Sequence, residues 1–304
     1  YNLAVKALPI DKDRVYLSGG SMGGQGTWHI GLHHSSLFAA LAPQAGWSTL
    51  HVYQPFAMQQ SRMFASPEIL LSRERARHDA NNLFFLENAE HLPVIITQGA
   101  KDKTVPPMHA RLFQKHLEIR DYQVNYRELQ DKAHWWDEPR SEGGGSDAVD
   151  NKEIIEFLRK QKREIPNSFK IRLYDLSLND RFYWIRVLSQ EKSMSQTRID
   201  AWVKDGKVIL ETENVRSLEI DLESLKHDVE QIQWNGVKTP VSGNQKVVLG
   251  EHLESPLAQT IRKHGAFKSV FFSPFVLVID DDPETLDLAR LISVCLLYTS
   301  DAAD

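Results

Sequence analysis

The pattern of apolar and polar residues changes once along the chain, near residue 165. Before that point, short apolar runs of strand length alternate with stretches in which apolar residues recur at helical spacing. Alternating strands and helices are typical of a parallel sheet covered by helices. The predicted strands are residues 15–18, 37–43, 93–97 and 123–129, and the predicted helices include residues 81–91, residues 108–119 and one that begins at Asp150 and contains residues 154–158.

Beyond residue 165 the apolar residues follow a period of two, which is typical of strands with one buried face. Two dipeptides, Asp205-Gly206 and Asn235-Gly236, predict hairpin turns because Asn, Asp and Gly adopt positive φ at low cost. We therefore expect a small antiparallel β-domain resembling a sandwich. Its predicted strands are residues 169–176, 182–188, 197–203, 208–212 and 215–222.

These patterns divide the chain into four predicted segments. Residues 1–165 form an α/β domain, residues 166–250 form the β-domain, and residues 251–294 begin a further α/β segment. Residues 295–304 resemble the translation of a sequencing adapter, so we leave them out of the fold prediction. With 41% hydrophobic and 25% charged residues among 304, the chain has enough apolar material for more than one folded domain.

Charge and hydropathy bear on the partners of the protein. The formal net charge of −5 gives no basic footprint for nucleic acid or an anionic membrane surface, so we expect neither as a partner. No apolar run has the length of a membrane span. The first residue is Tyr1, so we expect the natural N-terminus to lie outside this sequence. The single cysteine, Cys295, falls in the adapter-like end, so cysteine usage does not distinguish a periplasmic or extracellular protein from a cytoplasmic one. The oligomeric state stays open as well.

A candidate nucleophile follows the first predicted strand. The segment Gly19-Gly20-Ser21-Met22-Gly23 matches the pattern G-x-S-x-G, in which glycines let a strand and a helix approach closely around a strained serine. A Gly-rich turn without chemistry is the alternative. The strand before and the helix after the motif favour Ser21 as a nucleophile. The backbone N–H of Met22, at the start of that helix, would then donate one hydrogen bond to an oxyanion.

A serine hydroxyl needs a base to accept its proton, and the base needs a partner that orients it. Asp102 lies just after the predicted strand 93–97, and His134 lies just after the predicted strand 123–129. Taken singly, a turn aspartate and a packing histidine are the commoner interpretations. The chain order Ser, Asp, His, with each residue in a loop after a strand, jointly predicts a catalytic triad.

These segments carry a resemblance to a known family. Residues 12–47, 99–107 and 134–137 resemble the prolyl oligopeptidase family and its esterase-like relatives, including polyhydroxybutyrate depolymerase and feruloyl esterase types. The resemblance implies the C-terminal half of an α/β-hydrolase doubly wound parallel sheet, without a cofactor or metal. The strands and the loop with the second oxyanion donor would precede this sequence. Two positions depart from the family pattern: Gln98 replaces the usual His, and Ala133 the usual Gly.

The leading functional prediction is a serine hydrolase that cleaves an ester or peptide bond through an acyl-enzyme intermediate. Its partner would be a small-molecule, peptide or carbohydrate-ester substrate. A carboxylesterase acting on carbohydrate-linked or polyester substrates is one alternative, and a binding module with a vestigial hydrolase domain is another. A third is a signalling protein, because Asp280-Asp281-Asp282 resembles the opening of a receiver domain; we favour a strand-helix extension of the hydrolase there.

Weaker features surround the predicted triad. Trp47 and Trp135 could line a substrate pocket, although tryptophans more often pack in a core. His29 and His33 stand four positions apart on one helix and could in principle bind zinc. No third ligand follows at a suitable spacing, so we expect an ordinary helix face and no metal.

Overall fold

A computed structural model describes residues 2–49, 66–67, 78–137, 147–193, 195–225, 227–243 and 245–251. The predicted α/β segment at 251–294, with Asp280-Asp281-Asp282, and the adapter-like residues 295–304 lie outside these ranges, apart from Glu251. The predicted boundaries between segments therefore stay predictions.

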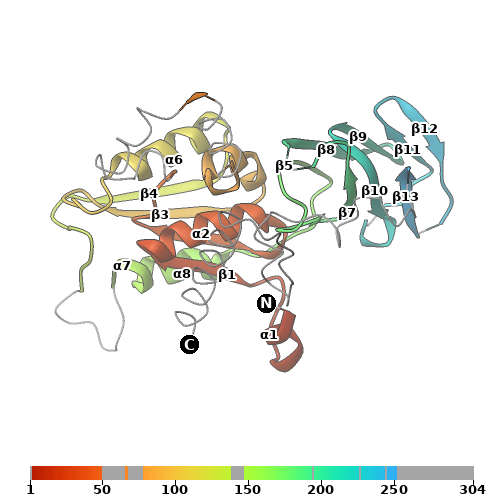
Figure 1. The fold of residues 1–304 in the computed structure, drawn as a ribbon. Helices are drawn as coiled ribbons and strands as arrows, with labels where there is room; N and C mark the ends of the chain where they lie inside the picture. The colour runs from red at the N-terminus through yellow and green to blue at the C-terminus, as the bar shows by residue number, and fades with distance from the viewer. Residues whose placement is uncertain are drawn as a thin grey trace, which may run out of the picture.

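The first part of the chain forms a parallel sheet, as predicted. Its four strands, in the order β1-β2-β3-β4, are Tyr16–Gly20, Ala40–Gln44, Val94–Gly99 and Val124–Leu129. The helices of this part are α1 (Asn2–Ala7), α2 (Met22–His33), α6 (Met108–Ile119), α7 (Asp147–Asp150) and α8 (Lys152–Lys160), with 3₁₀ turns η1 (Ser35–Leu37), η2 (His78–Ala80) and η3 (Asn82–Ala89). Figure 1 shows this sheet and its helices beside the strands of the second part.

Helices cover both faces of the parallel sheet. Successive side chains of a strand point to opposite faces, so the inner strands contribute apolar residues to a core on each side. Leu41 and Ile96 join the core formed with α2, η3 and α6. Ala42 and Ile95 belong to the opposite core, where they pack with Ile154 of α8. Strands β2 and β3 are buried along their whole length, as is typical of inner strands of a parallel sheet. Because the four strands are parallel, the loops that follow them all leave at the same edge of the sheet.

The second part of the chain folds into two packed sheets, β13-β10-β7-β6 and β12-β11-β9-β8-β5. A single hydrophobic core lies between them, so the predicted sandwich is present. Neighbouring strands are antiparallel except for β9 and β11, which pair in parallel. The strands are β5 (Ser168–Leu173), β6 (Arg181–Phe182), β7 (Ile185–Gln190), β8 (Thr197–Lys204), β9 (Lys207–Glu213), β10 (Val215–Asp221), β11 (Gln231–Trp234), β12 (Val237–Pro240) and β13 (Lys246–Gly250), with the 3₁₀ turn η4 (Leu222–Ser224) after β10.

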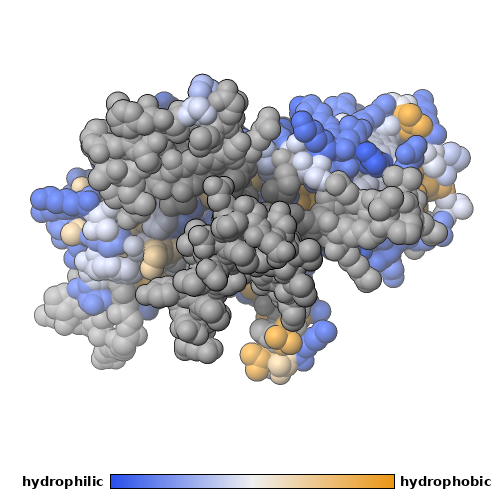
Figure 2. All heavy atoms as spheres, viewed as in Figure 1, coloured by the Kyte–Doolittle hydropathy of each residue, from blue (hydrophilic) through white to orange (hydrophobic). Residues whose placement is uncertain are grey.

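Both predicted hairpin turns are confirmed. Asp205 and Gly206 have φ of 50° and 69°, and Asn235 and Gly236 have φ of 46° and 86°. Two successive positive φ values are those of a type I′ turn, whose twist matches that of the flanking strands. The coloured residues of this β-domain are mostly hydrophilic in the view of Figure 2, whereas an apolar surface lies at the lower edge of that view, where Figure 1 places α1.

Some predicted elements differ in detail from the structure. The helix predicted at 81–91 is the 3₁₀ segment η3. The last helix, α8, begins after Asn151, whose side chain accepts hydrogen bonds from the N–H groups of Glu153 and Ile154; Asp150 instead ends α7. The strand predicted at 182–188 is interrupted where Tyr183 takes a φ of 50°.

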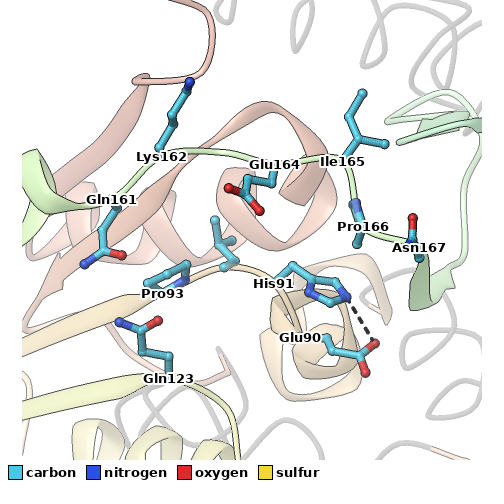
Figure 3. A pocket seen from close by; sticks show the side chains of 11 residues that line it. Glu90, His91, Pro93, Gln123, Gln161, Lys162, Glu164, Ile165, Pro166 and Asn167 are labelled. Carbon is cyan, nitrogen blue, oxygen red and sulfur yellow. Dashed lines mark ion pairs between the residues drawn. The ribbon is translucent and has the colours of Figure 1, made fainter. Parts of the chain in front are cut away.

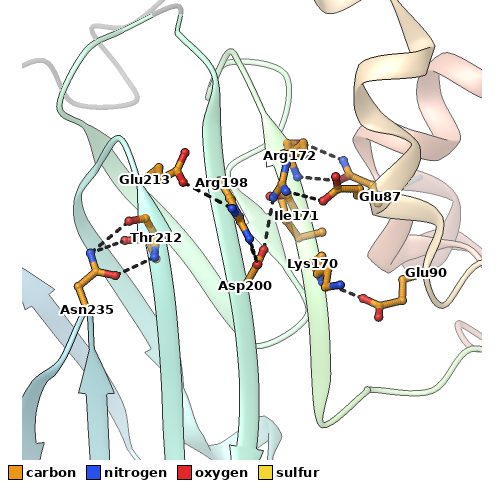
Figure 4. A network of polar contacts seen from close by, with 11 residues as sticks. Glu87, Glu90, Lys170, Ile171, Arg172, Arg198, Asp200, Thr212, Glu213 and Asn235 are labelled. Carbon is orange, nitrogen blue, oxygen red and sulfur yellow. Dashed lines mark hydrogen bonds and ion pairs between the residues drawn. The ribbon is translucent and has the colours of Figure 1, made fainter. Parts of the chain in front are cut away.

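The edge strand β5 packs against η3, and polar side chains bind the two parts of the chain together (Figure 4). The buried Asn88 donates to the carbonyl oxygens of Leu32 and Arg172 at 2.9 Å each, and accepts from the N–H of Arg172 at 2.7 Å. The side chain of Arg172 forms ion pairs with Glu87 of η3 and with Asp200 of β8. The Asn88 side chain thus pairs with the backbone C=O and N–H of Arg172 at the edge of β5, as a neighbouring strand would.

Candidate active site

Ser21 lies at the sharp turn between β1 and α2. Its φ of 57° and ψ of −114° are strained for a residue with a Cβ. Two backbone hydrogen bonds hold the turn: Ser21 N–H donates to the Gln44 carbonyl at 3.0 Å, and Gln25 N–H donates to the Ser21 carbonyl at 2.9 Å. The strand, the turn and the helix are those that the motif predicted.

The glycines around Ser21 have different steric roles. A Cβ on Gly19 would lie 2.5 Å from the carbonyl oxygen of Gly23, and one on Gly24 would lie 2.2 Å from that of Gln44. A Cβ on Gly23 would meet nothing within 4 Å in the described part of the chain. Gly19 and Gly24 therefore have no room for a side chain, because Gly19 lies against the backbone of Gly23 and Gly24 against that of Gln44. Gly23 itself has room for one among the described residues.

The structure brings Ser21, His134 and Asp102 together. The Nε2 atom of His134 is 2.9 Å from Ser21 Oγ, and its Nδ1 atom is 2.7 Å from Asp102 Oδ2. Both distances lie within hydrogen-bond range. If Nδ1–H donates to the carboxylate, Nε2 is left as the acceptor for the serine hydroxyl. The Asp102 side chain is fully buried and the His134 side chain is 15% exposed, so the imidazole is the accessible member of the pair.

The buried carboxylate of Asp102 accepts four hydrogen bonds. Oδ1 accepts from the backbone N–H groups of Thr104 and Val105 at 2.8 and 2.9 Å. Oδ2 accepts from His134 and, at 3.2 Å, from Nε2 of Gln98. Because a buried charge is costly unless it is paired, these donors keep the carboxylate in place and satisfied.

Gln98, near the end of β3, contacts the loop that follows this strand and carries Asp102, called the acid loop below. Besides Asp102, its Nε2 contacts the carbonyl oxygens of Gly99 and Val105 at 3.2 and 3.1 Å. Its side chain is completely buried. In the sequence, Gln98 stands out only as a departure from the pattern of the family that this segment resembles. Its position directly before the acid loop was the one signal that could have suggested this role.

Backbone contacts join the acid loop to the loop that follows β4 and carries His134, called the base loop below. Lys101 N–H donates to the carbonyl of Lys132 at 2.9 Å, and a Cβ on Gly99 would lie only 2.0 Å from the carbonyl oxygen of Ala133. Ala133 itself is exposed, which explains why a methyl group is accommodated before His134. The close approach is provided by Gly99.

The other predicted site residues occupy different surroundings. Helix α2 begins at Met22, so its N–H is among those that lack an intrahelical acceptor. Trp135 is 51% exposed, and its ring stands edge-on to His134 at 5.3 Å. Trp47 is buried and packs with Ala45 and Val105. Of these two tryptophans, Trp135 is the one with an exposed face beside the triad.

A second serine and histidine pair lies within the core. Ser48 Oγ is 3.1 Å from Nδ1 of His109, and the backbone N–H of Ser48 donates to the same nitrogen at 3.3 Å. Ser48 is 0% and His109 2% exposed, and burial lowers the pKa of His109. The buried Ser48 hydroxyl connects the loop after β2 to the start of α6.

His29 and His33 form part of an ordinary helix. His33 Nδ1 donates to the backbone carbonyl of His29 at 2.8 Å, and its ring packs against Phe85. Burial, reinforced by nearby His29, lowers the pKa of His33 to about 3. Among the described residues, His, Cys, Asp and Glu side chains form no group of three that could hold a metal ion. Within the same residues, no helix has the length and apolar character needed to cross a bilayer.

A polar cleft of about 470 Å³ lies between the parallel sheet and the connection to the β-domain (Figure 3). Pro93 and Gln123, which line it, directly precede β3 and β4, so the cleft lies at the strand edge opposite the triad. His91 in its wall already contacts the carbonyl of Ser168 at 2.6 Å, and Glu90 accepts from the N–H of Lys170. Its polar groups serve the junction of the two parts.

Comparisons with known proteins place the chain in a family. The model of the prolyl oligopeptidase family matches residues 2–160. An uncharacterized secreted protein of Arthroderma benhamiae (strain ATCC MYA-4681 / CBS 112371) is 33% identical over 128 residues, which are 42% of this chain and 13% of that protein. The chain therefore spans about an eighth of this relative.

Solved structures with some likeness include a thermostable esterase and an acylaminoacyl peptidase in complex with Z-Gly-Gly-Phe-chloromethyl ketone. The esterase is 23% identical with a TM-score of 0.35, and the match covers 53% of this chain and 35% of that one. The peptidase is 19% identical with a TM-score of 0.41, and the match covers 55% and 27%. These scores are low, so the assignment depends on the sequence match alone. By that match, which spans more than half of its residues, the chain belongs to the prolyl oligopeptidase family.

Proposed function

We propose that this protein is a serine hydrolase in which Ser21 is the nucleophile, His134 the general base and Asp102 the residue that orients the base. The observation that carries the proposal is the double contact of His134, at 2.9 Å from Ser21 Oγ and 2.7 Å from Asp102 Oδ2. Family membership supports the same chemistry. The neutral imidazole can accept a proton at one nitrogen while the other stays bound to the carboxylate.

Acylation begins when Ser21 Oγ attacks the carbonyl carbon of the substrate and its proton passes to His134 Nε2. The imidazolium is stabilised by Asp102, and the tetrahedral oxyanion is stabilised by the N–H of Met22. When the intermediate collapses, His134 gives its proton to the leaving alcohol or amine. The acyl group stays on Ser21 as an ester.

Deacylation repeats these steps with water. His134 takes a proton from the water molecule as its oxygen attacks the acyl-enzyme, and it returns the proton to Ser21 Oγ when the acid departs. Ester hydrolysis and peptide hydrolysis share this sequence and differ in the leaving group. The exposed ring of Trp135 beside His134 offers an apolar surface to one side of the substrate.

Peptide bonds and carboxylic esters are the two substrate classes for this site. A carboxylesterase acting on carbohydrate-linked or polyester substrates is the alternative to a peptidase. Parallel assays with p-nitrophenyl butyrate and with peptide p-nitroanilides distinguish them by the ratio of their kcat/KM values. A binding module with a vestigial hydrolase domain predicts no turnover of either compound.

Covalent labelling by a fluorophosphonate tests the proposed nucleophile directly. We expect the full-length protein to gain one label on the peptide that contains Ser21, and Ser21→Ala to abolish it. Ser48→Ala is the matched control, because Ser48 also contacts a histidine but is buried. Labelling that persists in Ser21→Ala, or an unlabelled folded wild type, would contradict the proposal.

A further inference from the structure

Gln44, the last residue of β2, contacts both the nucleophile turn and the base loop. Its main-chain oxygen accepts a hydrogen bond from the N–H of Ser21 at 3.0 Å. Its side-chain Nε2 donates to the main-chain oxygen of His134, also at 3.0 Å. One residue thus connects the two groups between which the proton must move, although they lie 113 positions apart in the chain.

Core packing alone does not account for a glutamine at this position. The Gln44 side chain is 0% exposed, and its Oε1 has no hydrogen-bond partner in the described part of the chain. A buried polar atom without a partner costs roughly 1–3 kcal/mol, which a leucine of similar size would avoid. What the amide provides in return is its donor, which faces a carbonyl that can only accept.

The side-chain amide of Gln44 lies where the turn that carries Ser21 comes close to the loop that carries His134. A Cβ on Gly20, the residue before Ser21, would be 2.6 Å from Gln44 Oε1 and 2.7 Å from the Trp135 ring. The Gln44 side chain therefore sits beside the end of β1 and holds the main chain of His134 next to it. Because only two side-chain torsions separate the backbone of a histidine from its ring nitrogens, a fixed carbonyl constrains where Nε2 can reach.

We propose that Gln44 is a positioning residue, whose side-chain amide sets the distance between His134 Nε2 and Ser21 Oγ by holding the carbonyl of His134. The inference rests on the proposed function, because it concerns the pair that transfers the proton. It assigns Gln44 no contact with the substrate. A displacement of about 1 Å in such a pair can reduce the rate of a chemical step about a hundredfold.

The first test uses the full-length protein with Gln44→Leu and the matched control Gln190→Leu. Gln190 is similarly buried, and its Nε2 donates to the carbonyl of Tyr174 and to Thr197 Oγ1 in the β-domain. Labelling by a fluorophosphonate is resolved into reversible binding and a maximal covalent rate. We expect Gln44→Leu to lower the maximal rate about ten- to a hundredfold with unchanged binding, and Gln190→Leu to leave both unchanged below its unfolding temperature.

A second variant distinguishes the loss of the hydrogen-bond donor from a loss of folding. Gln44→Glu preserves size but turns a carboxylate oxygen towards the His134 carbonyl, so it removes the donor at neutral pH. We expect both Gln44 variants to show cooperative thermal unfolding together with slow labelling. Maximal rates within twofold of the wild type in folded Gln44→Leu and Gln44→Glu would overturn the inference.

A spectroscopic measurement separates this inference from the proposed function. The Nδ1 proton of His134 is held against the buried Asp102, so its downfield NMR resonance reports on the position of the ring without any substrate. We expect this resonance to be sharp in the wild type and in Gln190→Leu, and to broaden by exchange in Gln44→Leu. If Ser21 of the wild type does not label but the resonance follows this pattern, the proposed function fails and the positioning role of Gln44 stands. An unchanged resonance in Gln44→Leu would overturn the positioning role.

Discussion

Gln98 and His134 donate hydrogen bonds to the same oxygen, Oδ2, of the buried Asp102 carboxylate. Gln98 approaches it from the end of β3, at 3.2 Å, whereas His134 approaches from the loop after β4, at 2.7 Å. The amide of Gln98 thus restrains the carboxylate from a second direction, in addition to the imidazole of His134.

Replacing Gln98 by leucine should weaken both the acid loop and the triad. The substitution removes the amide donor from the Val105 carbonyl and from Asp102 Oδ2, and a lost partner for a buried polar group costs roughly 1–3 kcal/mol. We expect urea denaturation to show a fall of this size in the free energy of unfolding, with slower fluorophosphonate labelling. Gln114→Leu on α6, where the amide donates to the exposed Glu118 one turn further along the same helix, serves as the control. Equal stability of the two variants would contradict the role given to Gln98.

The neighbouring glycines of α2 should respond in opposite ways to alanine. Gly24→Ala would place a methyl group 2.2 Å from the Gln44 carbonyl oxygen, so we expect clear destabilisation, of roughly 1–3 kcal/mol or more. Gly23→Ala meets open space among the described residues and gains helix propensity of up to about 1 kcal/mol. Thermal denaturation of the two variants measures the difference. A Gly23→Ala protein that unfolds earlier than Gly24→Ala would refute the steric assignment.

The buried His33 should make stability depend on pH. Burial lowers its pKa to about 3 in the folded protein, whereas the unfolded chain has the ordinary value of about 6.5. The unfolded state therefore binds a proton first as the pH falls, so the contribution of neutral His33 is complete above about pH 6.5 and is lost progressively towards pH 3. We expect His33→Gln to flatten the plot of unfolding free energy against pH in this window. Parallel plots for the variant and the wild type would rule out His33 as the cause.

The junction between the two parts should depend on Asn88. Asn88→Ala removes hydrogen bonds to the carbonyl and the N–H of Arg172 at the edge of β5, and one to the carbonyl of Leu32 in α2. We expect the free energy of unfolding to fall by roughly 1–3 kcal/mol. Hydrogen exchange should also accelerate at the amide of Arg172 before the rest of β5 opens. Unchanged protection of that amide would show that Asn88 does not secure the edge.

The elements that could be predicted from the sequence are those that local chemistry determines. Helix α6 runs over the residues that its apolar spacing predicted, 108–119. The Asn235-Gly236 turn follows from the backbone freedom of its own residues. Ser21, Asp102 and His134 could be singled out because the order of strands and loops along the chain restricts where such residues meet.

Other features depend on contacts that no local pattern records. The strand β11 pairs in parallel with β9, which only the assembled sandwich determines. Tyr183 takes a positive φ despite its bulky side chain, and so divides a stretch that reads as one strand. Gln44 and Gln98 resemble any polar residue at a strand end until the loops that their amides bind are placed.

The backbone hydrogen bond between Lys101 and Lys132, together with the close contact of Gly99 with Ala133, connects the loop that carries the Asp102 carboxylate to the loop that carries the His134 imidazole. A substitution that displaces either loop is therefore expected to disturb the acid and the base at the same time. Ser21 lies on a third connection, which Gln44 at the end of β2 links to His134 through one hydrogen bond to each.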